Sequence, residues 1–100
     1  MASHRITDKD LQAVVDRINR ITGSPMHPWT TLPDGRHASV IGNFHIDHAY
    51  GGVALHRMAN TAGAVNDVLR IGHVTKSALR DAMFAFIEGI NIGRECASRT

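Results

Sequence analysis

The sequence predicts a single α+β domain over residues 1–100, with an N-terminal helix, a three- to four-stranded antiparallel meander and a C-terminal helix. Three observations support this prediction. Residues 7–22 and 75–92 carry apolar side chains at helical spacing. Residues 44–48 alternate apolar and polar side chains, as a half-buried strand does. Clusters of Pro, Gly, Asn and Asp separate these segments and indicate turns.

The first predicted helix covers residues 7–22. Thr7 is placed to cap its N-terminus, where the negative charges of Asp8 and Asp10 are favourable. One face of the helix is expected to be buried, and its members are Leu11, Val14, Val15, Ile18 and Ile21. The other faces are expected to be polar and carry Asp16, Arg17, Asn19 and Arg20. Gly23 and Pro25 end the helix.

The sheet is expected to centre on residues 44–60. Residues 24–35 read as a loop that contains three prolines and Trp29, which is expected to pack there or cover a sheet edge. Strands are predicted at 37–41, 44–48 and 53–58, with a two-residue turn at 42–43. Phe44 and Ile46 are expected to face inward, and His45 and Asp47 outward. Whether residues 64–71 form a fourth strand stays open.

The second predicted helix covers residues 75–92, with Thr75 as its N-cap. Its buried stripe is expected to contain Leu79, Met83, Phe86, Ile87 and Ile90. Gly89 and Gly93 weaken its C-terminal end. Residues 1–6 and 94–100 are expected to be flexible ends.

Composition narrows the class of protein. A domain of 100 residues has a thin core, so self-association would help it. No segment approaches the roughly 20 apolar residues of a membrane span, and the first residues lack the apolar region of a signal peptide. The lone Cys96 excludes a disulfide framework and a cysteine-based zinc site. A net charge of +2 is too small for a dedicated nucleic-acid binder. The expected location is cytosolic.

The histidines raise the possibility of a metal site, but their spacing along the chain does not favour one. His45, Asp47, His48 and His56 are ligand types. However, His48 points to the opposite face of its strand from His45, and the spacing fits no helix-borne zinc motif. The sequence also lacks GxSxG, P-loop and GxGxxG motifs. We therefore expect no metal, no cofactor and no catalytic residue, with a histidine-based metalloenzyme kept as an alternative.

Binding of a small anionic ligand is the favoured interpretation. Tyr50 stands beside two glycines whose backbone can approach a ligand closely, while its ring offers a face for stacking. Residues 72–76 run into a helix N-terminus, where phosphate binds favourably. An isolated YGG is more often a tight turn, and the helix start would otherwise be an ordinary cap. The predicted ligand-binding residues are Tyr50, Gly51, Gly52, Arg57, Asn60, His73, Thr75, Lys76 and Arg80.

Three segments resemble a family of small phage and prophage proteins: DLQAVVDRINRITGSP, HIDHAYGGVALHRMAN and GHVTKSALRDAMFAFIEGI. The set YGGVxLHRMxN plus GHVTKxxL is similar to the type 1 Thoeris anti-defence proteins, and the resemblance covers nearly the whole chain. It implies sequestration, without cleavage, of cyclic nucleotide immune signals in the host cytoplasm. The implied ligands are cyclic ADP-ribose isomers held between protomers, or cyclic oligonucleotides. The implied assembly is a homo-oligomer, a dimer or a hexamer.

The resemblance also implies residue roles. Tyr50 would stack on a base, Asn60 would make a polar contact, and Lys76 and Arg80 would contact phosphates. The family more often has Arg near the start of the last helix, and Lys76 lacks the bidentate fork of that residue. The alternative is a small phage protein that modulates a host macromolecule, such as a nuclease or a transcription factor.

Overall fold

The computed structural model describes residues 5–99 and has the predicted α+β fold. Its elements, in chain order, are α1 (Asp8–Thr22), β1 (Trp29–Thr31), β2 (His37–Ser39), β3 (Phe44–Ala49), β4 (Gly52–Met58), β5 (Val65–Asp67) and α2 (Lys76–Ser98). The expected flexible ends at 1–6 and 94–100 lie partly outside the described residues, and their flexibility stays a prediction. No helix within residues 5–99 combines the length and the apolar character that a membrane span needs.

The strands form two sheets. β3, β4 and β5 make an antiparallel meander with β4 in the centre, and β5 settles that part of residues 64–71 is a strand. β2 does not pair with β3, so the expected hairpin turn at 42–43 is absent. It pairs instead with β1, inside the segment expected to be a loop. Gly42 has a φ of +91°, and its N–H donates a hydrogen bond to the Met58 carbonyl at the end of β4.

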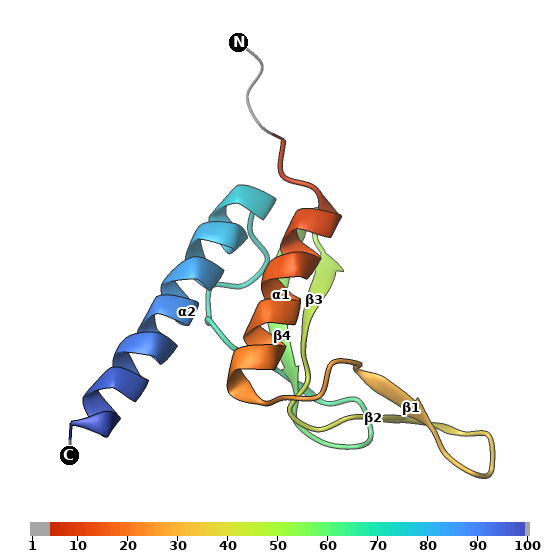
Figure 1. Cartoon of the computed structure of the whole chain (residues 1–100). Coiled ribbons are helices and arrows are strands. Elements are labelled where there is room, and N and C mark those ends of the chain that lie inside the picture. The colour runs from red at the N-terminus through yellow and green to blue at the C-terminus, as the bar shows by residue number, and fades with distance from the viewer. Residues whose placement is uncertain (1–4, 100) are drawn as a thin grey trace.

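The two helices run side by side and parallel (Figure 1), and α1 packs on β3 while α2 packs on β4. Lys76 at the start of α2 pairs with Asp8 at the start of α1, and Arg94 donates to the Ile21 carbonyl at the other end. Thr7 forms a capping box with Asp10, and Thr75 accepts the Ala78 N–H. The buried core consists of Leu11, Val14, Val15, Ile18, Phe44, Val53, Leu55, Leu79, Met83 and Ile87.

Helix α2 is longer than predicted, since it continues to Ser98 through Gly89 and Gly93. The glycine penalty of about 1 kcal/mol each did not end it. The bond from Arg94 to α1 is one interaction that holds the added turns. Residues 91–99 are nevertheless all exposed, so this last third of α2 adds nothing to the buried core.

Asn19 was predicted to lie on a polar face of the first helix, but it is buried, with only 1% of its surface accessible. Its side-chain amide pairs with the backbone of Phe44: Nδ2 donates to the carbonyl at 3.0 Å, and Oδ1 accepts from the N–H at 2.9 Å. This pair fixes the start of β3 against α1. An amide that satisfies two buried backbone groups is tolerated in a core.

The β1–β2 hairpin extends away from the body of the molecule (Figure 1). Its strands are mostly exposed, including Trp29, which is 51% accessible. Ser39 is the exception, since its hydroxyl bonds to the Asn60 carbonyl and to the Gly63 N–H. The radius of gyration is 15.1 Å, against about 13 Å for a compact domain of this length.

Candidate ligand-binding site

The β3–β4 hairpin ends in a two-residue turn formed by Tyr50 and Gly51. Ala49 pairs with Gly52, and both turn residues have positive φ, +54° for Tyr50 and +73° for Gly51. Such turns favour Asn-Gly, because the left-handed conformation is unfavourable by about 1–2 kcal/mol for most other residues. The Tyr50 side chain is also 96% exposed. Neither fact serves hairpin stability, so Tyr50 is a candidate for function.

Gly52 is needed for close contact between two backbones. A Cβ at this position would lie 2.9 Å from the Val74 carbonyl oxygen and 3.0 Å from the His73 carbonyl carbon. Val53 and Val74 exchange two backbone hydrogen bonds, of 2.8 and 2.9 Å. This bridge places the segment before α2 directly beside the hairpin. The sequence predicts that this glycine lets a ligand approach closely; in the structure the group that approaches Gly52 is the chain's own backbone.

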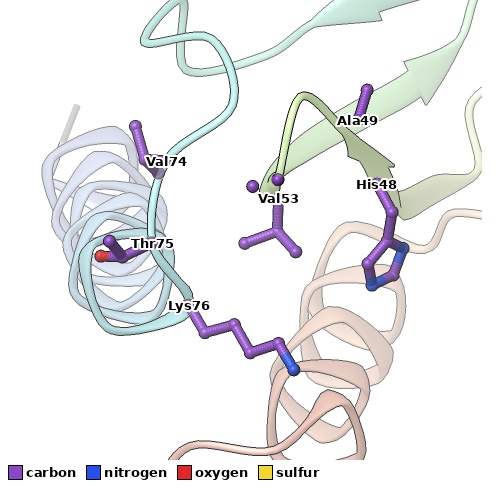
Figure 2. A pocket seen from close by; sticks show the side chains of 8 residues that line it. His48, Ala49, Val53, Val74, Thr75 and Lys76 are labelled. Carbon is purple, nitrogen blue, oxygen red and sulfur yellow. The ribbon is translucent and has the colours of Figure 1, made fainter.

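A pocket of about 360 Å³ lies between the hairpin and the start of α2 (Figure 2). This volume falls within the range of small-molecule sites. Lys76 extends from α2 toward α1, His48 points from β3 toward the same helix, and Val53 lies between them. The lining residues are His48, Ala49, Gly51, Gly52, Val53, Val74, Thr75 and Lys76. Four of them, Gly51, Gly52, Thr75 and Lys76, were predicted ligand-binding residues.

Asp8 connects Lys76 and His48 at this pocket. Its Oδ1 lies 3.2 Å from His48 Nε2 and 3.1 Å from Lys76 Nζ. The hydrogen bond with His48, and then that with Lys76, lowers the pKa of the Asp8 carboxyl below its ordinary value. All three side chains are well exposed. An exposed carboxylate therefore occupies the place where a ligand anion would be attracted.

The arrangement of the helices adds positive potential at the same end. Because α1 and α2 are parallel, the partial positive charges of both N-termini lie near the pocket. The first N–H groups of a helix have no partners within the helix, so they are available to an anion. Asp8 and Asp10 offset this potential in α1, whereas the first turn of α2 has no acidic residue.

Five predicted ligand-binding residues do not line the pocket, and three of these, Arg57, Asn60 and Arg80, make contacts elsewhere. Arg57 donates to the Gly42 carbonyl at 3.2 Å, and its guanidinium lies 4.9 Å from the centre of the Phe44 ring. Asn60 accepts from the backbone of Ala62 and Ala64 and so shapes its own turn. Arg80 lies 3.6 Å from Asp81. The structure therefore does not bring Arg57 and Asn60 into the pocket beside Lys76.

Tyr50 and His73 belong to a second group, on the sheet face away from the helices. Their rings lie 5.5 Å apart edge to face, and His73 Nε2 lies 2.7 Å from Asp47 Oδ2. The His56 ring lies 5.8 Å from that of His73 and 6.0 Å from that of His45. The hydrogen bond from His73 lowers the pKa of Asp47. Burial, and then the charge of His56, lowers the pKa of His45.

Sequence reasoning did not bring Asp47, His56 and His73 together. A two-residue turn at Tyr50 and Gly51 would have placed His45 opposite His56, which is the observed register. The position of His73 carried no such signal, since it depends on the bridge between Val53 and Val74.

Comparisons of the chain with protein-family models, with curated proteins and with solved structures gave no match in any of the three. The chemical evidence for a function therefore comes from the two side-chain groups described above. One is the pocket at the helix N-termini, and the other is the histidine group on the opposite sheet face.

Proposed function

We propose that this chain is a ligand-binding protein that sequesters a cyclic nucleotide immune signal in the host cytoplasm without cleaving it. One observation carries the proposal: Lys76, His48 and the start of α2 surround a pocket whose hairpin wall is glycine backbone. The Lys76 ammonium and the helix N-termini favour a phosphate-bearing ligand. The resemblance to the type 1 Thoeris anti-defence proteins supports the choice of a cyclic ADP-ribose isomer or a cyclic oligonucleotide.

The phosphate takes the position of the Asp8 carboxylate in this proposal. Asp8 is exposed and makes its contacts with the pocket through His48 and Lys76. A phosphate carries more acceptor oxygens than a carboxylate and can also reach the free N–H groups of α2. Ligand binding therefore replaces one ion pair with a larger set of charge-assisted hydrogen bonds.

Tyr50 supplies the second part of the binding surface. Its ring lies at the tip of the hairpin whose next two residues line the pocket, and it is almost fully exposed. A nucleobase attached to the bound phosphate reaches this ring by extending over the tip. Stacking of a base on an aromatic side chain contributes about 1–3 kcal/mol and tolerates different bases.

Binding without cleavage fits the chemistry of the side chains that line the pocket. Thr75 carries the one hydroxyl among them, and it accepts the Ala78 N–H as a helix cap. His48 is engaged by Asp8 and has no nucleophile as a partner among these residues. Nucleophilic attack needs a nucleophile and a base within hydrogen-bond reach of each other.

We propose further that the chain acts as a homo-oligomer. Helix α2 exposes Phe84 and Ile92, which are 45% and 49% accessible, and all residues of its last third are exposed. Exposed apolar side chains of this size on one element are typical of association surfaces. A second copy would cover them and supply further walls to an open pocket.

Calorimetry with cyclic ADP-ribose isomers and cyclic trinucleotides tests the proposal. Binding, followed by recovery of the unchanged ligand after heat denaturation, is the expected result. Lys76→Gln should weaken binding at least about tenfold, because a charge-assisted contact is lost. Lys9→Gln is the matched control, since it removes the same charge from the start of α1 without touching the pocket.

Two results would contradict the proposal. Absence of binding to every one of these ligands would favour the alternative, a protein that acts on a host macromolecule. Recovery of a chemically altered ligand would indicate an enzyme.

A further inference from the structure

The sheet face opposite the helices collects metal-ligand side chains from three segments. In the antiparallel register His45 lies opposite His56, and His56 lies opposite Asp67. Directly paired residues project from the same face, so these three form one row across the sheet. Asp47 lies in the neighbouring row opposite Ala54, which is buried although it is on this outer face. His73 approaches Asp47 from the segment before α2.

The ligand atoms of Asp47, His56 and His73 lie close enough to share one ion. One atom from each residue lies within 4.8 Å of the others, and Asp47 Oδ2 is 2.7 Å from His73 Nε2. Ligand atoms around a tetrahedral zinc ion are about 3.3–3.4 Å apart, given bonds of about 2.0–2.1 Å. Zinc binding therefore requires the hydrogen bond between Asp47 and His73 to open by about 0.6 Å as both ligand atoms turn toward the ion. Among residues 5–99, this is the one group of three or more His, Cys, Asp or Glu residues whose ligand atoms all lie this close together.

The positions of these ligands are set by backbone contacts. The bridge between Val53 and Val74, made possible by Gly52, holds His73 over the sheet. The β3–β4 register holds Asp47 and His56. All three residues are partly buried, and the His73 side chain is only 16% exposed. A pre-formed donor set of this kind does not need to be ordered when an ion binds.

The surroundings also favour a cation. Asp67 accepts the Gly72 N–H through Oδ2, while its Oδ1 is buried and has no hydrogen-bond partner. This unpaired acceptor belongs to the row that contains His56. Two imidazoles and one carboxylate form a borderline nitrogen and oxygen donor set, which suits zinc and its neighbours in the first transition series better than calcium or magnesium.

We propose that Asp47, His56 and His73 bind one divalent transition-metal ion of the zinc class on the outer face of the sheet. The remaining coordination positions are open to water or an anion, as in zinc sites with three protein ligands. The Tyr50 ring, 5.5 Å from that of His73, borders the site. The site is separate from the pocket beside Lys76 and does not depend on the proposed function.

Titration calorimetry with Zn²⁺, on chelator-treated protein that carries no histidine tag, tests this proposal. The expected result is one ion per chain, with affinity reduced at least about tenfold in Asp47→Asn and His56→Gln. His37→Gln, in the other sheet, is the matched control and should bind as the unaltered chain does. Visible absorption of bound Co²⁺ should disappear in Asp47→Asn and persist in the control.

The alternative is that Asp47 and His73 form only a structural hydrogen bond, which holds the segment before α2 against the sheet. It predicts no ion, or equal binding by all variants, and either result would overturn the proposal. Circular dichroism establishes that each variant is folded. Should His56→Gln fail to fold, the partly exposed and isosteric Asp47→Asn decides alone. Lys76→Gln should leave Zn²⁺ binding unchanged, which distinguishes this site from the pocket.

Discussion

At the residue scale, Tyr50 is expected to lower the stability of the fold while contributing to ligand binding. Its left-handed backbone conformation suits Asn far better than a bulky aromatic residue. We expect Tyr50→Asn to raise the free energy of unfolding by about 0.5–1 kcal/mol in urea titrations. The same change should weaken nucleotide binding at least about fivefold, since the stacking face is lost. Unchanged affinity in calorimetry would show that the ring does not contact the ligand.

Asp8 competes with the ligand for Lys76 and His48. Asp8→Asn keeps the shape of the side chain and removes its charge, so Lys76 and His48 become available to the ligand. We expect ligand binding to tighten by roughly two- to fivefold, the size of an exposed ion pair. The gain should shrink at high salt, because exposed charges are screened. Asp34→Asn, in the β1–β2 hairpin, is the control; an equal gain there would indicate a general charge effect.

Asn19 connects α1 to β3 through two buried hydrogen bonds. Asn19→Leu keeps a similar volume but leaves the N–H and the carbonyl of Phe44 without partners. Each unsatisfied buried group costs about 1–3 kcal/mol, so we expect a loss of about 2–4 kcal/mol in the free energy of unfolding. Asn91→Leu, on the exposed end of α2, should change stability by less than about 0.5 kcal/mol. Similar losses in both variants would contradict this role.

At the element scale, local sequence patterns predicted the two helices and the β3–β4 hairpin. Each depends on periodicity and caps within one short segment, such as Thr7 with Asp10. The pairing of β1 with β2 was missed because it joins strands of three residues, too short for a period-2 pattern. The burial of Asn19 was missed because its partner is the backbone of a distant strand, which no side-chain pattern records.

The candidate site was predicted only in part, because some of its residues belong to local features and others are placed by long-range contacts. Gly51, Gly52, Thr75 and Lys76 lie at a hairpin tip and a helix start, which are features of local sequence. Their proximity follows from the Val53–Val74 bridge, a long-range contact. That bridge also separates His73 and Tyr50 from Lys76, and it brings His73 to Asp47. The division into two groups therefore could not be read from the sequence.

The outer face of the β3–β4 pair should make stability depend on pH. Burial lowers the pKa of His45 below its ordinary value of 6.5, with a further contribution from His56. The unfolded chain then binds more protons, so stability is complete above about pH 6.5 and falls as the pH falls toward the folded-state pKa. Asp47, whose pKa is lowered from 3.8, loses its contribution only in stronger acid.

Thermal unfolding at pH 7.5 and pH 5.5 checks this dependence. The melting temperature should fall between the two values in the unaltered chain and fall less in His45→Gln, which has no proton to gain. An equal decrease in both proteins would assign the pH dependence to other groups. His37→Gln again serves as the control, because His37 is exposed in the second sheet.

At the scale of the whole molecule, the exposed end of α2 predicts association. Light scattering after size exclusion should give a dimer or a larger species. Phe84→Glu and Ile92→Glu should shift the population toward the monomer, because each buries a charge in an apolar contact. Gln12→Glu, on an exposed part of α1, is the control. A monomer at the concentrations used for calorimetry would contradict the proposed oligomer.

The extended β1–β2 hairpin has an optical consequence. The chain contains one tryptophan, Trp29 on that hairpin, and one tyrosine, Tyr50 at the tip of the other sheet. Each fluorophore therefore reports on a known place without any label. Changes in tyrosine emission should follow events at the hairpin tip, and changes in tryptophan emission should follow events at the projecting arm. A single titration read in both channels would separate events at the hairpin tip from events at the projecting arm.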